Sequence, residues 1–288
     1  MRKKLRELIS RKESLLVPFA YDAFSAMLVQ NAGFPAVGIS GSAVAASLFG
    51  VPDVGLLSRE DIVSHARRIV EAVNIPVIAD ADTGYGGPLQ ASRTIKHFES
   101  AGVAGIFMED QEDPKKCGHL EGIKVISKRS MIGKLEAVLH ERVDPDFVVI
   151  ARTDSISVEG IKGAADRANS YINAGADLAF VSGFASVRDV QEVSKLVNPN
   201  SLMIVMTEGG KTPIMPMEDL EDLGYKLIGY SGLTLGSAGY AINQNLEKLR
   251  NEGDSIEIID RVMPLTQRNE ILKLSKFQEI ESKFLIED

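Results

Sequence analysis

The sequence has a single cysteine, no tryptophan and four histidines. One cysteine excludes an intramolecular disulfide and favours a reducing compartment, so we expect a cytoplasmic protein. The formal net charge of −8 disfavours nucleic-acid binding, which requires a basic face. No uncharged run approaches the roughly 20 residues of a membrane helix, and charged residues between Leu5 and Leu16 interrupt any signal-peptide core. We therefore expect neither a nucleic acid nor a membrane as a partner.

Short apolar runs recur along the chain, each after an amphipathic stretch and a turn-type cluster. Continuous apolar runs are typical of parallel strands buried on both faces, and helical periodicity lies between them, for example at Arg59–Val73. Eight such strand–helix units predict a (β/α)₈ barrel as one domain over residues 1–288. The alternative is an open doubly wound sheet, but no Gly-x-Gly-x-x-Gly follows an early strand. The eight runs begin near residues 15, 36, 77, 103, 147, 178, 202 and 226.

The segment from about Gly253 to Asp288 exceeds what a barrel needs. Within it, Leu265 to Phe284 carries apolar residues at spacings of three and four, which predicts an amphipathic helix. Such a helix needs an apolar surface to cover, either on its own barrel or on a partner. We therefore expect a C-terminal helical extension.

The segment Asp80-Ala81-Asp82-Thr83-Gly84-Tyr85-Gly86 follows the third apolar run. Alternate residues of a strand point the same way, so Asp80 and Asp82 would place two carboxylates side by side. Such a pair is half of a hard-cation site, because Mg²⁺ takes about one or two carboxylates together with water and substrate oxygens. Glu109 and Asp110 follow the next run and are expected nearby. The alternative is a turn in which aspartate caps the following helix.

Active sites of (β/α)₈ barrels lie at the carboxyl ends of the strands, where this sequence collects polar residues. Arg152 directly follows the fifth run, and a guanidinium there is suited to bidentate capture of a substrate carboxylate. An ion pair with Asp154 or Glu109 is a compatible alternative. Ser40-Gly41-Ser42 could offer hydroxyls and backbone N–H groups to a carboxylate or phosphate. Asp53 is either a turn residue or a supporting acid, and Asp22 and Glu208 also follow strand ends.

Gln111–Lys128 is long for a strand–helix connection, which usually has about 2–6 residues, and long loops of this kind often act as lids. It contains Lys115-Lys116-Cys117-Gly118-His119. Positive charge beside Cys117 is expected to lower the pKa of its thiol and to attract anionic substrates. A disordered insertion with a surface thiol is the alternative. The other histidines are expected at the surface, namely His65, His97 and His140.

Together these residues resemble the isocitrate lyase/phosphoenolpyruvate mutase superfamily over nearly the whole chain. The similarity begins at Val17-Pro18-Phe19-Ala20-Tyr21-Asp22-Ala23, and Lys115-Lys116-Cys117-Gly118-His119 resembles the lyase signature. Within the superfamily, the sequence is most similar to 2-methylisocitrate lyases, 2,3-dimethylmalate lyases and carboxyphosphonoenolpyruvate phosphonomutase-like proteins. The resemblance implies a Mg²⁺-dependent barrel, with Mn²⁺ as an alternative, that acts on a small-molecule carboxylate through an enolate-like state.

The resemblance also implies roles for individual residues. Cys117 would protonate the leaving carbanion, and the catalytic residues implied beside it are Glu109, His119 and Arg152. The residues implied at the metal are Asp53, Asp80, Asp82 and Glu109. The residues implied at the substrate are Ser40, Gly41, Ser42, Asp80, Gly118, His119, Arg152 and Glu208. Homotetramers whose paired barrels exchange C-terminal helices are typical of the superfamily and are expected here.

Three positions depart from the pattern of the lyases. Gly38, Ser182 and Val205 stand where the lyases carry tyrosine, glutamate and asparagine. A carbon–carbon lyase of the methylisocitrate lyase type remains the leading interpretation, but these changes favour an acid that is smaller or more apolar than methylisocitrate. A phosphonomutase-like enzyme and a non-catalytic homologue that binds 2-oxo acids are the alternatives.

Overall fold

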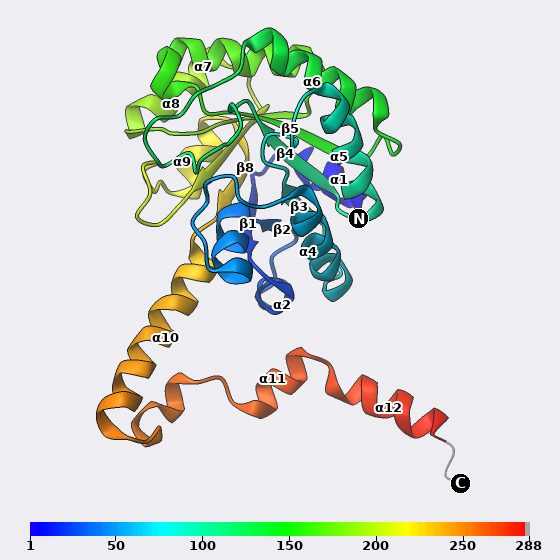
Figure 1. Ribbon diagram of the computed structural model, residues 1–288, viewed down its shortest axis with the longest axis vertical. Coiled ribbons are helices and arrows are strands. Elements are labelled where there is room, and N and C mark those ends of the chain that lie inside the picture. The colour runs from blue at the N-terminus through cyan, green and yellow to red at the C-terminus, as the bar shows by residue number, and fades with distance from the viewer. Residues whose placement is uncertain (286–288) are drawn as a thin grey trace. The chain divides into compact units, whose positions relative to one another are not determined.

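The computed structural model describes residues 1–285. The chain divides into two compact units, Met1–Leu235 and a segment that begins at Gly236. The strands of the first unit form a closed parallel barrel in chain order, in which β8 pairs with β1 (Figure 1). The (β/α)₈ prediction is therefore confirmed, and the open sheet is excluded. The strands are β1 Leu15–Ala20, β2 Val37–Ile39, β3 Val77–Asp80, β4 Gly105–Glu109, β5 Val148–Thr153, β6 Leu178–Val181, β7 Leu202–Met206 and β8 Tyr225–Tyr230.

Helices alternate with the strands and surround the barrel (Figure 1). Among residues 1–285, no helix is both long enough and apolar enough to cross a membrane. The helices of the first unit are α1 Arg2–Ile9, α2 Ala23–Asn31, α3 Gly41–Val44, the π-helix η1 Ala45–Phe49, α4 Arg59–Ala72, α5 Pro88–Ser100, α6 Lys128–Glu141, α7 Ile156–Asn173, α8 Val187–Leu196, α9 Met217–Asp222 and the start of α10 Leu233–Glu252.

Local sequence explains where several of these helices begin. The Asp22 carboxylate accepts the backbone N–H of Ser25 at 2.7 Å and caps α2 in a reciprocal capping box. Ser58 and Ser186 cap α4 and α8 in the same way. Asp22 is thus a helix cap, although it follows a strand end.

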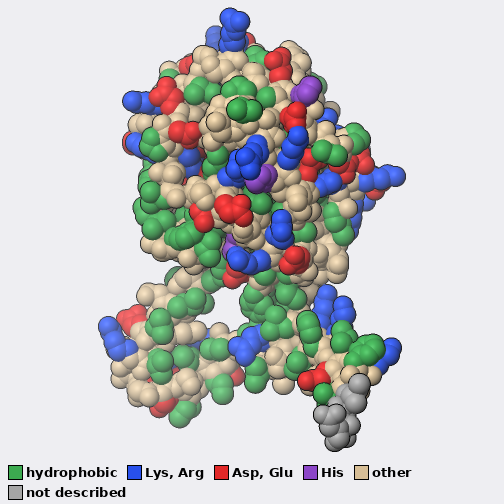
Figure 2. Space-filling view, turned by 45° about the vertical axis from the view of Figure 1, so that its right-hand side comes forward, with side chains coloured by type: hydrophobic (Ala, Val, Ile, Leu, Met, Phe, Trp, Pro, Cys, Tyr) green, Lys and Arg blue, Asp and Glu red, His purple; other side chains and the backbone are tan. Residues whose placement is uncertain are grey.

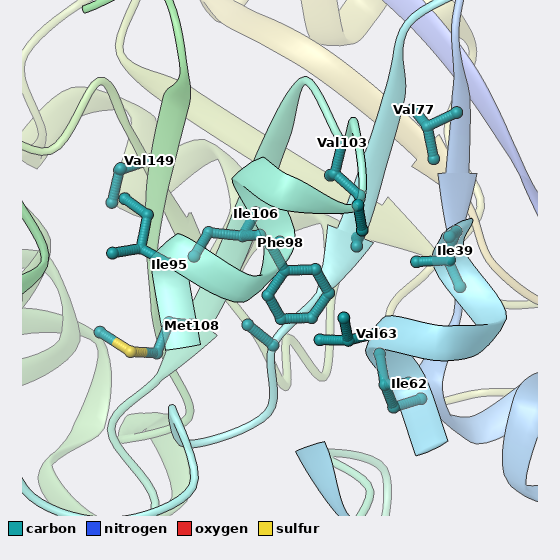
Figure 3. Packing of buried hydrophobic residues seen from close by; sticks show 14 of the residues in the cluster. Ile39, Ile62, Val63, Val77, Ile95, Phe98, Val103, Ile106, Met108 and Val149 are labelled. Atoms are coloured by element: carbon teal, nitrogen blue, oxygen red, sulfur yellow. The ribbon is translucent and has the colours of Figure 1, made fainter. Parts of the chain in front are cut away.

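Two apolar layers hold the barrel together. Inside it, the rings of Phe19 and Phe107 lie 5.9 Å apart, and those of Phe107 and Phe180 lie 6.1 Å apart. Leu5 and Leu8 of α1 belong to the same interior cluster. Outside it, helices α4 and α5 pack on β2 to β5, as Figure 3 shows around Phe98. Because α1 packs with the barrel interior at its amino end, the carboxyl ends of the strands remain for a site.

The second unit consists of helices that expose apolar side chains (Figure 2). The predicted single helix Leu265–Phe284 is wrong in one respect, because Lys273 adopts a left-handed conformation with φ of 56°. Two helices result, α11 Leu265–Ile271 and α12 Leu274–Phe284, and neither contains a buried residue. The short 3₁₀ helix η2, Ile256–Arg261, precedes them. The C-terminal helical extension itself is present.

One histidine does not lie at the surface as expected. His65 lies on the buried side of α4, 7% exposed, and its Nε2 is 2.6 Å from the carbonyl oxygen of Tyr21. The helical pattern predicted an amphipathic helix there, but it did not show that the loop after β1 covers this turn. His97 is partly exposed and His140 is exposed.

Candidate active site

Two aspartates at the end of β3 converge with residues from neighbouring loops. Asp80 Oδ1 accepts the N–H of Asp82 at 3.0 Å, and Asp80 Oδ2 accepts the N–H of Gly41 at 3.3 Å. A Cβ on Gly41 would lie 2.8 Å from Asp80 Oδ2, so a glycine is needed for this approach. The Lys115 ammonium lies between two further carboxylate oxygens, 2.5 Å from Asp53 Oδ1 and 2.7 Å from Asp82 Oδ1.

Arg152 lies beside these aspartates on β5. Its Nη1 is 2.9 Å from Glu109 Oε2, since Glu109 and Arg152 are register partners on β4 and β5. Its Nη2 donates to Asp154 Oδ1 at 2.9 Å, and the guanidinium lies 5.2 Å from the centroid of the Phe180 ring. The predicted ion pairs with Glu109 and Asp154 are therefore both present. We refer to Asp53, Asp80, Asp82, Glu109 and Asp154 as the acidic cluster.

Burial and like charge perturb the acidic cluster strongly. Burial, reinforced by Asp82, raises the pKa of Asp80 to about 6. Burial also raises the pKa of Glu109 well above its usual range, although Arg152 opposes the change. Burial alone would lower the pKa of Lys115, but the surrounding carboxylates raise it above its ordinary value. The site therefore combines permanently charged cations with carboxylates that are costly to ionise.

The chemistry of the acidic cluster fits a divalent cation. Its five carboxylates outnumber the two side-chain cations that contact them, Lys115 and Arg152. Glu109 Oε1 and Asp154 Oδ2 are buried and have no hydrogen-bond partner, which is costly unless a cation or water satisfies them. Within residues 1–285 no three acidic, histidine or cysteine side chains already form a ligand set. Carboxylate oxygens beside a strand end are nevertheless the donors that Mg²⁺ prefers.

The loop between β4 and α6, predicted to act as a lid, is ordered, and we call residues 111–127 the lid. Gln111 pairs with Val125 as an antiparallel bridge, and its side-chain amide bonds both the N–H and the carbonyl of Lys116 at 2.9 and 2.8 Å. The N–H of Cys117 donates to the carbonyl oxygen of Asp53 at 2.9 Å. These contacts place the thiol-bearing residue beside the acidic cluster, so the alternative of a disordered insertion is not supported.

Gly118 and His119 attach the lid to the other side of the barrel mouth. A Cβ on Gly118 would lie 2.6 Å from Asp154 Oδ1, 2.7 Å from Ser182 Oγ and 2.9 Å from Arg152 Nη2. His119 Nδ1 accepts the N–H of Lys211 at 3.0 Å, so Nε2 carries the proton and donates to Thr207 Oγ1 at 3.2 Å. Burial and Arg152 lower the pKa of His119, which keeps its ring neutral near pH 7.

The expected net lowering of the Cys117 pKa is wrong, although the nearby cations act in the expected direction. Burial raises the pKa of the Cys117 thiol, and this outweighs the lowering effects of Arg152, Lys115 and a hydrogen bond from the backbone of His119. Lys115 is neutralised by Asp53 and Asp82, so most of its charge is not available to the sulfur. A protonated thiol at neutral pH is suited to donating a proton, not to nucleophilic attack.

The three positions predicted to depart from the lyase pattern lie on the barrel strands or directly after one, Gly38 on β2, Val205 on β7 and Ser182 after β6. A Cβ on Gly38 would lie 2.2 Å from Cδ1 of Phe19, so the Phe19 ring occupies the space of any side chain there. Ser182 is buried beside Gly118, and Val205 is 8% exposed. These positions thus present a small hydroxyl and apolar surfaces.

Sequence comparison places this arrangement in a known superfamily. The profile of the phosphoenolpyruvate phosphomutase family matches residues 5–250. The 2,3-dimethylmalate lyase of Eubacterium barkeri is 38% identical over 281 residues, which is 98% of this chain and 97% of that relative. The chain belongs to the phosphoenolpyruvate mutase/isocitrate lyase superfamily. The 2-methylisocitrate lyase of Halalkalibacterium halodurans is also similar, at 36% identity over 96% of this chain and 91% of the relative.

Solved structures of the superfamily agree with the fold. Oxaloacetate acetylhydrolase in complex with 3,3-difluorooxalacetate matches with a TM-score of 0.92 and 32% identity, over 98% of this chain and 96% of that one. Phosphonopyruvate hydrolase in complex with oxalate and Mg²⁺ matches with a TM-score of 0.90 and 25% identity, over 99% of both chains. Since its relatives are lyases and mutases of this superfamily, the chain is an enzyme.

Most residues predicted for a superfamily active site lie together. Gly41, Asp53, Asp80, Asp82, Glu109, Cys117, Gly118 and Arg152 form one connected set of contacts. Ser40 caps α3 through its hydroxyl, while Ser42 and Glu208 are exposed. Among residues 1–285, no hydrogen bond or ion pair joins Ser42 or Glu208 to the acidic cluster. Their roles, like the metal-binding and catalytic roles of the others, stay predictions.

Two contributions to the site were missed from the sequence. Lys115 is the cation that pairs with Asp53 and Asp82, whereas its charge was assigned to the thiol. Phe19 covers Gly38, although the two residues are far apart in sequence. The sequence did contain a signal for this role of Lys115. It lies two residues before Cys117, so a lid that brings the cysteine to the strand ends brings the lysine there as well.

Proposed function

We propose that this enzyme is a Mg²⁺-dependent carbon–carbon lyase that cleaves a methyl-substituted 2-hydroxy dicarboxylate to pyruvate, or another 2-oxo acid, and a second carboxylic acid. The observation that carries the proposal is the position of Cys117. Its backbone is bonded to Asp53, and burial keeps its thiol protonated beside a buried guanidinium and the acidic cluster. This is the placement required of a proton donor to a carbanion.

Different residues of the site would bind different parts of the substrate and the metal ion. Arg152 would capture the carboxylate of the 2-oxo acid half, assisted by Ser40, Gly41 and Ser42. Gly118 and His119 would close over the substrate with the lid, and Glu208 would contact its far end at the rim. The residues that would hold Mg²⁺ are Asp53, Asp80, Asp82 and Glu109. When bound, Mg²⁺ would supply positive charge that stabilises negative charge on the oxygen of the 2-oxo acid.

The bond changes balance without an oxidant or a second substrate. The proton of the 2-hydroxyl passes to a carboxylate of the acidic cluster, for which the raised pKa of Asp80, about 6, is suited. The C2–C3 bond breaks, a carbonyl forms at C2, and the electron pair stays on C3. C3 then takes the proton of the Cys117 thiol. Once the lid opens, the carboxylate releases its proton to solvent and Cys117 takes one up, which restores the enzyme.

The pocket walls support a small substrate with apolar substituents. Phe19 fills the space above Gly38, and Val205 presents methyl groups where an amide would bind a further carboxylate. Burying an extra carboxylate against such groups without a partner is costly. The similarity to 2,3-dimethylmalate lyase supports the same substrate size. We therefore favour dimethylmalate-like acids over methylisocitrate.

The test is a substrate panel with purified protein. Release of the 2-oxo acid would be followed by reduction with lactate dehydrogenase, as pyruvate from 2,3-dimethylmalate, citramalate and methylisocitrate and as glyoxylate from isocitrate, and acetate release would be measured for oxaloacetate. We expect the highest kcat/KM with a methyl-substituted malate and no turnover in EDTA. Product release from none of these acids in the presence of Mg²⁺ or Mn²⁺ would refute the proposal.

The Cys117→Ser variant tests the proton donor. A hydroxyl is a much weaker acid than a thiol, so kcat should fall by about 10²–10⁴-fold, while oxalate and Mg²⁺ still bind. Lys124→Ala, an exposed change in the same lid, is the matched control and should retain activity. Equal turnover in Cys117→Ser and the native protein would remove Cys117 from the mechanism.

Phosphorus–carbon chemistry is the second candidate. It is favoured by the match of residues 5–250 to the phosphoenolpyruvate phosphomutase profile. Phosphorus NMR of phosphonopyruvate incubated with the enzyme and Mg²⁺ would reveal a new phosphate ester or inorganic phosphate. An unchanged spectrum together with turnover of a malate would exclude this second candidate and support the lyase assignment.

The C-terminal helices support a proposal about assembly. Helices α11 and α12 expose Leu265, Phe277, Ile280 and Phe284, and they bury none of their residues. Apolar surface of this kind is typical of an interface. We propose that these helices are exchanged between paired barrels in a homotetramer, as expected for the superfamily, and that the enzyme works in the cytoplasm. Light scattering should give four chains, and removal of residues 254–288 should lower that number.

A further inference from the structure

Asp110 is the most heavily bonded carboxylate of the barrel mouth, and its side chain contacts the acidic cluster through the backbone N–H of Asp154. It is fully buried, and it follows Glu109 at the end of β4. Its Oδ2 accepts the hydroxyl of Thr153 at 2.7 Å, the hydroxyl of Tyr171 at 2.7 Å and Nη1 of Arg167 at 3.0 Å. We call Asp110, Arg167 and Tyr171 the anchoring triad.

The anchoring triad reaches Arg152 through Asp154. The other oxygen of Asp110 accepts the backbone N–H of Asp154 at 3.1 Å, and the carboxylate of Asp154 holds Arg152 Nη2 at 2.9 Å. Thr153, which lies between Arg152 and Asp154 in the chain, also donates its hydroxyl to Asp110. The direction in which Arg152 presents its guanidinium therefore depends on where Asp110 holds the backbone after β5.

The anchoring triad also holds the base of the lid. Nη1 of Arg167 donates to the carbonyl oxygen of Ile126 at 2.9 Å, and the N–H of Ile126 donates to the carbonyl oxygen of Asp110 at 2.9 Å. The Arg167 guanidinium is itself fixed by Glu159, through bonds of 2.7 and 2.6 Å from Nε and Nη2. One buried guanidinium is thus shared by the lid stem, the end of β4 and helix α7.

We propose that Asp110, Arg167 and Tyr171 are positioning residues, which fix the carboxylate-binding Arg152 and the stem of the lid relative to each other. Catalysis is sensitive to displacements of about 1 Å at the reacting groups. Loss of a triad bond therefore weakens carboxylate capture and loosens the lid in addition to lowering stability. The proposal rests on the proposed function only in taking Arg152 as the group that binds a substrate carboxylate.

The chain offers a matched pair of variants for the test. Tyr171 and Tyr225 are both fully buried tyrosines. The Tyr225 hydroxyl donates to the carbonyl of Val190 at 3.2 Å, away from the triad and the lid. Tyr171→Phe and Tyr225→Phe each remove one buried hydroxyl, so both should lower the melting temperature. Arg167→Lys is a third variant, because it keeps the charge but has one donor group for the four partners Asp110, Ile126, Glu159 and Tyr171.

Two readouts distinguish positioning from general stability. The first is the Kd of oxalate in the presence of Mg²⁺, measured by calorimetry, and the second is the rate of tryptic cleavage after the exposed lid residues Lys116 and Lys124. We expect Tyr171→Phe and Arg167→Lys to raise the oxalate Kd by about fivefold or more and to speed lid cleavage. Tyr225→Phe should change both readouts by less than about twofold.

The outcomes are distinct for the two proposals. Equal changes in Tyr171→Phe and Tyr225→Phe, or a lowered melting temperature with unchanged oxalate affinity and lid cleavage, would overturn the positioning role. Failure of the native protein to bind oxalate would overturn it as well, because Arg152 would then not capture carboxylates. If the native protein binds oxalate but cleaves none of the hydroxy acids, the proposed lyase activity fails and the comparison of variants still decides the positioning role.

Discussion

Gly118 is the position where a single methyl group should lower turnover strongly without unfolding the protein. In the closed lid, a Cβ at this residue would lie 2.6 Å from Asp154 Oδ1, 2.7 Å from Ser182 Oγ and 2.9 Å from Arg152 Nη2. Comfortable non-bonded separations are about 3.5 Å or more. The nearest contact is therefore short by nearly 1 Å, and Asp154 and Arg152 are buried and bonded to each other. We expect the lid to move, because it is the less constrained partner.

The size of the effect follows from this displacement. A shift of about 1 Å in a reacting group can reduce the rate by about 10²-fold, and Cys117 precedes Gly118 directly. Gly118→Ala should therefore lower kcat by about 10²-fold. The free energy of unfolding should change by less than about 0.5 kcal/mol, as for a surface substitution, since the lid can open to relieve the overlap.

The assay pairs turnover with thermal and chemical unfolding. Gly87→Ala is the control, because it lies at the barrel rim before α5 and its Cβ would meet Gln90 Oε1 at an ordinary 3.6 Å. Gly87→Ala should keep turnover within about twofold of the native enzyme, given that surface changes have small effects. Native turnover in Gly118→Ala would show that catalysis does not need the closed lid, and the placement of Cys117 as proton donor would lose its geometric basis.

Further predictions concern the charged groups. Burial raises the pKa of Asp80 from 3.8 to about 6. Without metal, the contribution of Asp80 to the free energy of unfolding is therefore fully favourable below about pH 4, where the carboxyl is neutral, and is lost as the pH rises through about 6. At pH 7.5 ionised Asp80 should cost up to about 3 kcal/mol, and Asp80→Asn should raise the urea midpoint of the metal-free protein at pH 7.5 but not at pH 4. Because Mg²⁺ requires ionised carboxylates, its affinity measured by calorimetry should fall as the pH drops below about 6, and a pH-independent affinity would contradict the raised pKa. Arg152→Lys loses the two-pronged guanidinium, so the oxalate Kd should rise about tenfold or more while the circular dichroism spectrum stays native.

The barrel could be predicted from the sequence because its signal is local and repeated. Each strand is a continuous apolar run, and buried parallel strands require that pattern wherever they occur. The gathering of Asp80, Glu109 and Arg152 followed from the same rule, since strand ends meet at one face. The C-terminal segment shows the limit, because apolar spacing in Leu265–Phe284 continued through Lys273 although the backbone turns there.

What could not be predicted depends on burial and on contacts between distant segments. The sequence shows lysines beside Cys117, but it does not show that Lys115 is neutralised by Asp53 and Asp82 or that the thiol is shielded from water. These two facts reverse the direction of the pKa shift. Similarly, the role of Phe19 over Gly38 arises from neighbouring strands β1 and β2, and no local pattern reports it.

The lone cysteine has a practical consequence. Because Cys117 is the only thiol in the chain and lies half-buried in the lid, a maleimide dye or spin label attached there reports on a single place without removal of other cysteines. Its rate of alkylation measures how often the lid exposes the sulfur. Oxalate or Mg²⁺ that favours the closed lid should slow the labelling. The native sequence thus carries its own site-specific reporter of lid opening.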